Sequence, residues 1–362
     1  MKNAKRLLAL VLALVMSLSL FACGQKQQKD KTDDGSQTET TRVFTDSCGR
    51  EVKVPTDIQK VAVSGPLAQM VVFAIAPDKM VGVANAWDEN AKTYFDAKYL
   101  DLPLLGQLYG GKGELNLEML LAAEPDVVID VGEPKDSMAE DLDALQEQTG
   151  IPFVHIDAYL ASMDDTYAML GDLLAMPNEA QGLADYCRYA YDKVKAIADS
   201  VEKVNLLYVT GEEGLNVIAR GSYHAEVIDM LCSNLAVVDE PSSKGTGNEV
   251  DMEQILNWNP DAVIFAPGSI YSTVADNENW RTIPAIRDGR YYEVPMGPYN
   301  WMGFPPSVQR ILGMQWMSKV LYPDAADYDM YETTQTYFQL FYHCDLTAEQ
   351  YAALTAHSLA AD

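Results

Sequence analysis

Along most of the chain, stretches with apolar residues at helical spacing alternate with short, continuous apolar runs. The clearest case occurs twice, as LNLEMLLAAEPDVVID at Leu115–Asp130 and as VDMEQILNWNPDAVIF at Val250–Phe265. Each copy has a Glu, an apolar stripe, a Pro-Asp pair seven residues after the Glu, and a run rich in β-branched residues. This pattern predicts a helix, a tight turn and a strand buried on both faces. Two such units in two halves of the chain indicate two similar α/β lobes.

The remaining pattern of the first half completes one such lobe. Val43–Pro55 alternates apolar and polar residues around Cys-Gly-Arg, which predicts a β-hairpin. Further elements are expected as a strand at Val61–Ser64, a helix at Ala68–Ala76, a strand at Met80–Ala84, and, after the first repeat copy, a strand within Gly150–Asp157.

A long helical tract then connects the two halves. It runs over Asp164–Met176, is broken at Pro177, and continues over about Glu179–Val201. In the second part, apolar residues recur at helical spacing and leave acids and lysines on the other side, at Leu183, Tyr186, Ala190, Val194, Ile197 and Val201. We expect one long helix to join the lobes, after which LLYVT, a helix at Ala225–Cys232, the second repeat copy and RYYEVP build the second lobe.

The first residues have the features of a targeting segment. Three basic residues precede the apolar run Leu7–Leu18, and Leu20-Phe21-Ala22 leads to Cys23. This segment resembles a bacterial lipoprotein signal peptide, and the apolar run is short for a membrane helix. The resemblance implies cleavage after residues 1–22 and acylation of the Cys23 thiol. Residues 23–41 are polar and predict a flexible tether.

Composition and charge limit the partners of the folded part. Hydrophobic residues make up 48% of the chain, enough for a sizeable core. The formal charge is −27, and cleavage before Cys23 removes three basic residues and no acid, which leaves −30. Because such an excess repels phosphate backbones, no nucleic acid partner is expected. We expect a monomer.

The cysteines and histidines are too scattered for a local metal motif. Neither a zinc site nor a disulfide framework follows from the spacing of Cys48, Cys187, Cys232 and Cys344, so paired and free thiols both remain open. The histidines are equally dispersed, at His155, His224, His343 and His357. The sequence also lacks a nucleophile elbow, a P-loop, H-E-x-x-H and a dinucleotide motif. We therefore predict no enzyme, no catalytic residue, no protein-held metal and no cofactor.

Several of these segments together resemble a known family. The matching segments are TDSCGREVKVP at Thr45–Pro55, KMVGV at Lys79–Val83, LEMLLAAEPDVVI, GIPFVHID, MEQILNWNPDAVIF and GRYYEVP at Gly289–Pro295. In this order they resemble the periplasmic-binding proteins of the siderophore, haem and cobalamin type, which feed ABC importers. The resemblance covers the chain from about Arg42 to Pro323.

The resemblance implies the fold class α/β, with two α/β lobes joined by a single long helix and a ligand cleft between the lobes. The corresponding boundaries are an N-terminal lobe at 42–162, an interlobe helix region at 163–203, and a C-terminal lobe with C-terminal helices at 204–362. A hinge of this kind is stiff, so closure on the ligand should be small.

The resemblance also implies an ABC permease with its ATPase as partner, and a place at the cell membrane. The protein would be anchored through its N-terminal lipid on the extracytoplasmic face, either on a Gram-positive surface or in a periplasm. In the family, the acid that opens each repeated unit sits at the outer tip of its lobe and pairs with permease arginines. Here these positions are Glu118 and Glu253. As acids near helix N-termini, both also favour the helix dipole.

The residues that contact the ligand should come from loops at the strand ends. We expect them to be Trp87, Tyr109, Arg220, Tyr223, His224, Tyr299 and Trp301. Aromatic walls with a few cationic groups suit a large metal chelate. The alternative for Trp301 and Tyr299 is core packing, and for Arg220 it is a surface ion pair. His224 could ligate metal, or it could serve in the first turn of the helix that follows.

Three functions are therefore open. The first is a substrate-binding lipoprotein that delivers an iron-siderophore, haem or corrinoid chelate. The second is the same scaffold with another cargo, such as a nickel chelate. The third is a tethered extracellular enzyme that acts on a tetrapyrrole or metal chelate. An anionic cargo would require local positive charge from Arg220, Lys112 or Lys244.

Overall fold

The computed structural model describes residues 40–109 and 114–359. Cys23, the signal peptide and nearly all of the predicted tether lie outside the described residues, as does Lys112. The chain from Thr40 onward forms one compact unit. Within the described ranges, no helix is both long and apolar enough to span a bilayer.

A β-hairpin opens the folded part, as predicted. Strands β1 (Thr41–Thr45) and β2 (Glu51–Pro55) pair antiparallel. Their alternation turns Phe44 into the core. The turn is held by the Asp46 carboxylate, which accepts two backbone N–H bonds, and by Gly49, whose φ of 76° suits glycine.

The sheet of the N-terminal lobe consists of three parallel strands. The order is β3 (Val61–Val63), β4 (Val127–Gly132) and β5 (Phe153–Asp157), with β4 in the centre. All six residues of β4 are buried, as expected for a strand covered on both faces. The helices of this lobe are α2 (Pro66–Ile75), α3 (Ala97–Leu100), α4 (Leu117–Ala123) and α5 (Met138–Thr149).

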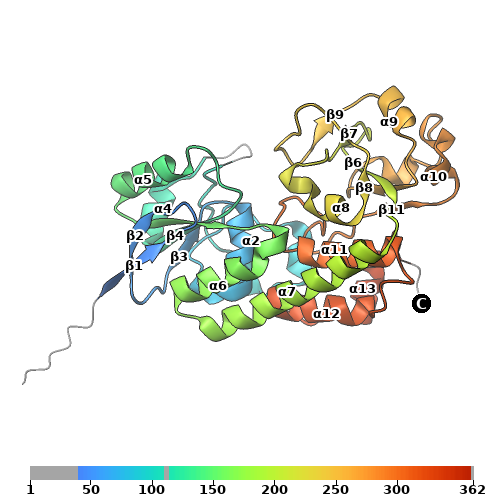
Figure 1. The fold of residues 1–362 in the computed structure, drawn as a ribbon. Helices are drawn as coiled ribbons and strands as arrows, with labels where there is room; N and C mark the ends of the chain where they lie inside the picture. The colour runs from blue at the N-terminus through green and yellow to red at the C-terminus, as the bar shows by residue number, and fades with distance from the viewer. Residues whose placement is uncertain (1–39, 110–113, 360–362) are drawn as a thin grey trace, which may run out of the picture. The chain divides into compact units, whose positions relative to one another are not determined.

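Two packed helices follow the first lobe. Helix α6 (Met163–Leu174) ends at Ala175, which is left-handed with a φ of 54°, and α7 (Pro177–Ser200) begins with proline at its first turn. The helices pack closely at Gly171, where an added Cβ would lie 2.4 Å from the Ala180 Cβ. Helix α7 is the predicted long helix between the lobes, and Figure 1 shows it extending past α11 and α12.

The C-terminal lobe has a six-stranded sheet in the order β11-β10-β6-β7-β9, with β8 paired to β6. The pairs of β6 with β8 and β10, and of β10 with β11, are parallel, whereas β7 is antiparallel to β6 and β9. The strands are β6 (Asn205–Thr210), β7 (Asn216–Val217), β8 (Ser233–Asn234), β9 (Asn248–Glu249), β10 (Ala262–Phe265) and β11 (Tyr291–Glu293). The helices are α8 (Glu226–Leu231), α9 (Met252–Trp258) and α10 (Pro284–Arg287).

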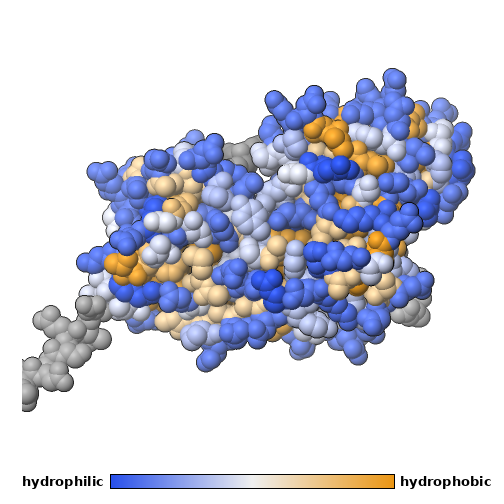
Figure 2. Space-filling view, in the orientation of Figure 1, coloured by the Kyte–Doolittle hydropathy of each residue, from blue (hydrophilic) through white to orange (hydrophobic). Residues whose placement is uncertain are grey.

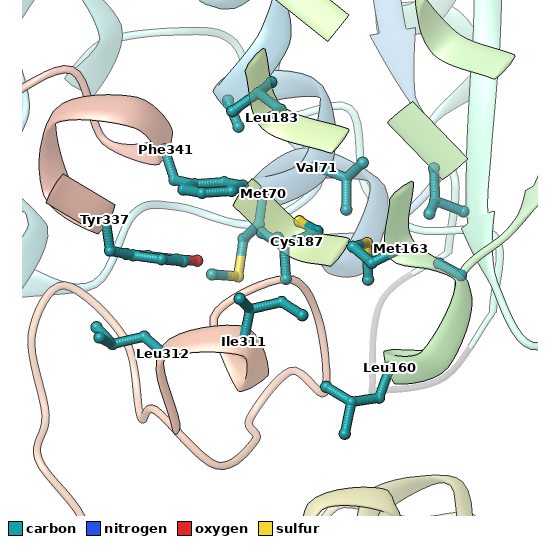
Figure 3. Packing of buried hydrophobic residues seen from close by; sticks show 14 of the residues in the cluster. Met70, Val71, Leu160, Met163, Leu183, Cys187, Ile311, Leu312, Tyr337 and Phe341 are labelled. Carbon is teal, nitrogen blue, oxygen red and sulfur yellow. The ribbon is translucent and has the colours of Figure 1, made fainter. Parts of the chain in front are cut away.

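The last helices return to the first lobe. They are α11 (Arg310–Leu321), α12 (Met330–Phe341) and α13 (Ala348–Thr355). Helix α11 contacts α7 and α8, and α12 contacts α2 and α7. Figure 3 shows side chains of this cluster that come from different elements, among them Met70 of α2, Cys187 of α7 and Phe341 of α12, and the ring of Phe341 stacks on Tyr337 at 4.4 Å between centroids. One apolar core therefore joins the N-terminal lobe, the connecting helix and the chain end.

The two repeat copies have the same local structure. Asn116 caps α4 and Asp251 caps α9, and each side chain accepts the backbone N–H of the residue three positions later in the chain. Each helix ends in a left-handed residue directly before the Pro-Asp pair. Asp126 and Asp261 then each accept a backbone N–H at the start of a neighbouring strand. The sequence repeat is therefore a repeat of helix, turn and strand, as predicted.

Two expectations need correction or completion. The strand predicted at Met80–Ala84 is only an extended segment with isolated bridges to Val61 and Leu104, because the chain crosses two neighbours without staying beside either. The question left open for the cysteines is answered for the described chain, where Cys48, Cys187, Cys232 and Cys344 are all free.

Candidate functional site

The carboxyl ends of the parallel strands in the two sheets face the junction of the lobes. Ala158, directly after β5, accepts a hydrogen bond from the Tyr223 hydroxyl of the C-terminal lobe. The rings of Tyr159 and Tyr223 lie edge to face, 5.9 Å apart. Thr210, the last residue of β6, donates to the Thr246 carbonyl at 2.6 Å. Open α/β sheets bind ligands at such strand ends, so we take this region as the candidate cleft.

One loop of the cleft passes close to two aromatic side chains. A Cβ added to Gly245 would lie 2.9 Å from a ring carbon of Phe304 and 3.4 Å from a ring carbon of His224. Glycine therefore allows this loop to touch both rings. Phe304 is 38% exposed and has a φ of 57°, which is unusual for a large side chain. We call Tyr159, Tyr223, His224, Gly245 and Phe304 the cleft cluster.

His224 is neutral at physiological pH. It is 8% exposed in the 3₁₀ turn η4 (Tyr223–Ala225), and its Nε2 lies 3.2 Å from the Ser243 carbonyl oxygen. Burial lowers the pKa of His224 to about 4, and the positive charges of Arg310 and Lys135 add to the decrease. The turn immediately precedes α8, so His224 lies at the start of that helix, as in the alternative that the sequence leaves open.

One lysine from each lobe lies near the cleft cluster, where the carboxylates of Glu133 and Glu226 also act on Tyr159 and Tyr223. Lys244 precedes Gly245 and is exposed. Lys135, from the N-terminal lobe, acts electrostatically on His224 and is itself 3.8 Å from the Glu133 carboxylate. That exposed pair is weak, so the lysine keeps its charge available to a ligand. The face of the molecule drawn in Figure 2 carries many hydrophilic residues with apolar areas between them.

Beneath the cleft, the N-terminal sheet contains a buried polar network. The Ser64 hydroxyl donates to the Asp130 carboxylate, whose other oxygen lies 2.6 Å from His155 Nδ1. His155 Nε2 lies 3.0 Å from the Asp157 carboxylate. Burial alone lowers the pKa of His155, but the two aspartates outweigh it and raise the pKa. Across 40–109 and 114–359, no three His, Cys, Asp or Glu side chains are arranged to hold a bare metal ion.

Arg310 fastens the junction from the C-terminal side and was not singled out in the sequence. Its Nη1 donates to the Glu226 carboxylate and to the Tyr223 carbonyl, both at 2.7 Å, and its guanidinium lies 4.5 Å from the Tyr223 ring centroid. Glu226 also accepts the backbone N–H of Leu160 at 3.2 Å. The buried Nη2 of Arg310 has no hydrogen-bond partner in the part of the chain that the structure describes. A proline-rich loop before a helix is too general a signal to have identified this arginine.

The tryptophans expected at the ligand lie in the core. Trp301 is fully buried and donates its indole N–H to the Gly297 carbonyl at 3.1 Å. Trp87 is 7% exposed and donates to the Tyr99 carbonyl at 2.7 Å. Tyr299 is half-buried, with its ring 6.4 Å from that of Trp87, and burial raises its pKa. Both indoles are therefore packed in the core, and their only polar atom is bonded to the backbone.

Two other expected residues are held away from the cleft cluster. Arg220 is exposed, and its guanidinium donates twice to the Asn234 carbonyl, at 2.6 and 3.1 Å, instead of forming an ion pair. Tyr109 donates to the Asp141 carboxylate at 2.8 Å, and burial together with that bond raises the pKa of its hydroxyl. Of the seven residues expected at the ligand, the structure brings Tyr223 and His224 together in the cleft cluster.

The expected docking acids are exposed on equivalent helices. Glu118 lies in the first turn of α4 and Glu253 in the first turn of α9. Both are exposed, and neither forms an ion pair with another described residue. Each carboxylate is therefore available to a partner.

Residues 61–296 match the family described as periplasmic binding protein. The chain belongs to the periplasmic binding protein family. This is a family of binding proteins, not enzymes, and its ABC-transporter members deliver their substrate to a permease.

Two curated relatives cover most of the chain. The molybdate-binding protein MolA of Haemophilus influenzae is 23% identical over 335 residues, which cover 83% of this chain and 91% of that protein. The ABC transporter substrate-binding lipoprotein YvrC of Bacillus subtilis is 22% identical over 328 residues, which cover 87% of this chain and 96% of that protein.

Solved structures have the same two-lobed fold. An ABC transporter solute-binding protein from Sulfurospirillum deleyianum superposes with a TM-score of 0.80 at 25% identity, covering 87% of this chain and 99% of that one. Molybdate-bound MolA superposes with a TM-score of 0.67 at 21% identity, covering 84% and 99%. The predicted fold class, two α/β lobes joined by a helix, is confirmed.

Proposed function

We propose that this protein is the lipid-anchored, extracytoplasmic receptor of an ABC importer that captures an anionic metal chelate, with a ferric siderophore as the first candidate. The chelate would bind in the cleft and pass to the permease, driven by the associated ATPase. The lipoprotein-type N-terminus with Cys23 and the likeness to the lipoprotein YvrC support the anchor. The charge-bearing tips Glu118 and Glu253 support the docking.

The observation that carries the ligand class is the pair of lysines beside the cleft cluster. Lys135 and Lys244 come from different lobes, in a chain whose formal charge is −27. A neutral or cationic ligand would gain nothing from them. An anionic chelate would be attracted by both and could pack its organic part against Phe304 and the tyrosines of the cleft cluster.

A metal oxyanion is the second candidate, because the relative MolA is named for binding molybdate. Molybdate and a ferric catecholate share negative charge but differ in size. Haem, a corrinoid and a nickel chelate are the other cargoes expected from the sequence, and only some of these are anionic. The family is one of binding proteins, which argues against the tethered enzyme as a function of this chain.

Calorimetric titration of the chain tests the ligand class. The panel consists of a ferric catecholate, a ferric hydroxamate, haemin, cobalamin, nickel-histidine and molybdate. We expect the tightest binding for an anionic ferric chelate, and a loss of about tenfold or more in the variant K135Q/K244Q. Lys195→Gln is the matched control, since Lys195 is an exposed lysine on α7 that pairs with Asp199. Tightest binding of cobalamin, or equal affinity in both lysine variants, would contradict the proposal.

A further inference from the structure

Large apolar side chains are rarely exposed on this protein, and several of them are close to the docking acids. Three of them belong to the two repeated helices: Met119 at 39% and Leu121 at 48% on α4, and Leu256 at 39% on α9. The remaining exposed ones in the described ranges are Val43, Leu104, Tyr189, Val237 and Phe304. Leu104 directly precedes Leu105, whose carbonyl accepts the N–H of the α4 N-cap residue. Isolated exposed leucines are common, so their position must decide whether they matter.

Leu121 and Leu256 occupy the same position in the two repeat copies. Each follows the docking acid of its helix by three residues, so leucine and glutamate share one face of the helix. The preceding residues, Leu120 and Ile255, are fully buried and hold the helices on their lobes. Burial of these helices therefore does not require a second apolar residue on the outer side.

The two repeat copies differ at most exposed positions, but both have the glutamate and the leucine. The Pro-Asp pair is identical in the two copies. Pro125 and Pro260 form the turn, and the aspartates that follow them accept backbone N–H groups. These identities have an internal structural reason. The exposed leucines have no such reason, because neither helix needs them for its burial, and the exposed glutamates have only the weak one of favouring the helix dipole. An identity kept on two outer surfaces indicates a partner that touches both.

We propose that Leu121 and Leu256 are apolar contacts of the surface that docks on the permease, each beside its glutamate. The inference rests on the proposed function, which supplies the permease as the partner. It assigns that partner two equivalent sites, each with a basic side chain next to an apolar depression.

The two kinds of contact make distinct contributions to docking. Exposed glutamates attract a basic surface over a distance, and this attraction is screened by salt. A buried leucine acts only on contact and is insensitive to salt, so its loss increases the dissociation rate. Docking should therefore retain a salt-resistant part that depends on the leucines.

The test measures binding of the full-length chain to the importer's permease–ATPase complex in nanodiscs, at 0.05 and 0.5 M salt. The variants are L121S/L256S, the milder L121Q/L256Q and the charge reversal E118K/E253K. The matched control is V43S, because Val43 is more exposed than either leucine and lies on the hairpin. We expect both leucine variants to bind the complex about tenfold more weakly at either salt concentration, because they dissociate faster. Their affinity for the ligand should not change, and V43S should bind the complex as the wild type does.

The outcomes separate the inference from the function on which it rests. Docking that is lost in E118K/E253K but unchanged in both leucine variants would overturn the leucine contacts and leave the function standing. Docking that is unaffected by either set would overturn the docking surface as a whole. A loss of affinity in the leucine variants that disappears at high salt would also contradict an apolar contact.

Discussion

Protonation of His224 should be strongly disfavoured, and the structure gives the size of the effect. Its pKa is about 4 in the folded chain, against an ordinary value of 6.5. This decrease corresponds to about 3 kcal/mol between the two protonation states. Burial is the main cause, since the ring is 8% exposed, and the charges of Arg310 and Lys135 add to it.

The sign of the effect on stability follows from the direction of the change in pKa. Between pH 6.5 and about 4, the unfolded histidine takes up a proton while the folded one stays neutral. The contribution of His224 to stability is therefore present above pH 6.5 and is lost as the pH falls towards 4. His155, whose pKa is raised, behaves in the opposite way, because its contribution is present below 6.5 and is lost as the pH rises through its folded pKa.

The assay is an NMR titration of the imidazole ring protons, which is practical because the chain has only four histidines. The signal missing from His224→Gln identifies the residue, and its midpoint should lie near pH 4. Lys135→Gln should raise that midpoint by roughly 0.3 pH unit, because Lys135 acts from the other lobe. A midpoint at or above pH 6, or a stability difference between wild type and H224Q that does not change from pH 7 to 4.5, would refute the reasoning.

Two further predictions concern the junction and the lobe tips. Arg310→Met should destabilise the chain by about 3 kcal/mol in urea unfolding, because it leaves Glu226 unpaired at a site that is mostly buried, and adding Glu226→Gln should recover part of the loss. A loss of less than about 1 kcal/mol in the free energy of unfolding, or no recovery of it in the double variant, would contradict this role of the Arg310–Glu226 ion pair. Reversal of both expected docking acids to Lys, in E118K/E253K, should abolish uptake of the ligand by cells while ligand affinity stays the same. Normal uptake in that variant would be inconsistent with docking through these acids.

Much of the fold could be predicted because its signals are local. The repeat copies carry their own caps, turn prolines and buried runs, so Asn116 and Asp251 build the same structure in both lobes. The break at Pro177 marks the start of α7, since proline suits the first turn of a helix. The segment at Met80–Ala84 was misjudged because apolar content does not indicate whether a partner strand runs alongside.

The site was harder to predict because it depends on contacts between distant segments. Tyr223 and His224 were expected near the ligand from their loop before a helix start, and their contact with a ligand stays a prediction. The position of Trp301 in the core could not be predicted, because the sequence does not show that its indole N–H bonds to the Gly297 carbonyl. Arg310 could not be recognised, since its partners Tyr223 and Glu226 are more than eighty residues away along the chain.

The most direct test of the central claim is ligand-dependent ATP hydrolysis by the permease–ATPase complex in nanodiscs, with and without this chain. The account predicts that an anionic ferric chelate stimulates hydrolysis only when the chain is present, and that E118K/E253K abolishes the stimulation although it still binds the chelate. Equal stimulation without the chain, or by a charge-reversed chain, would contradict the claim that this protein delivers the ligand to the importer.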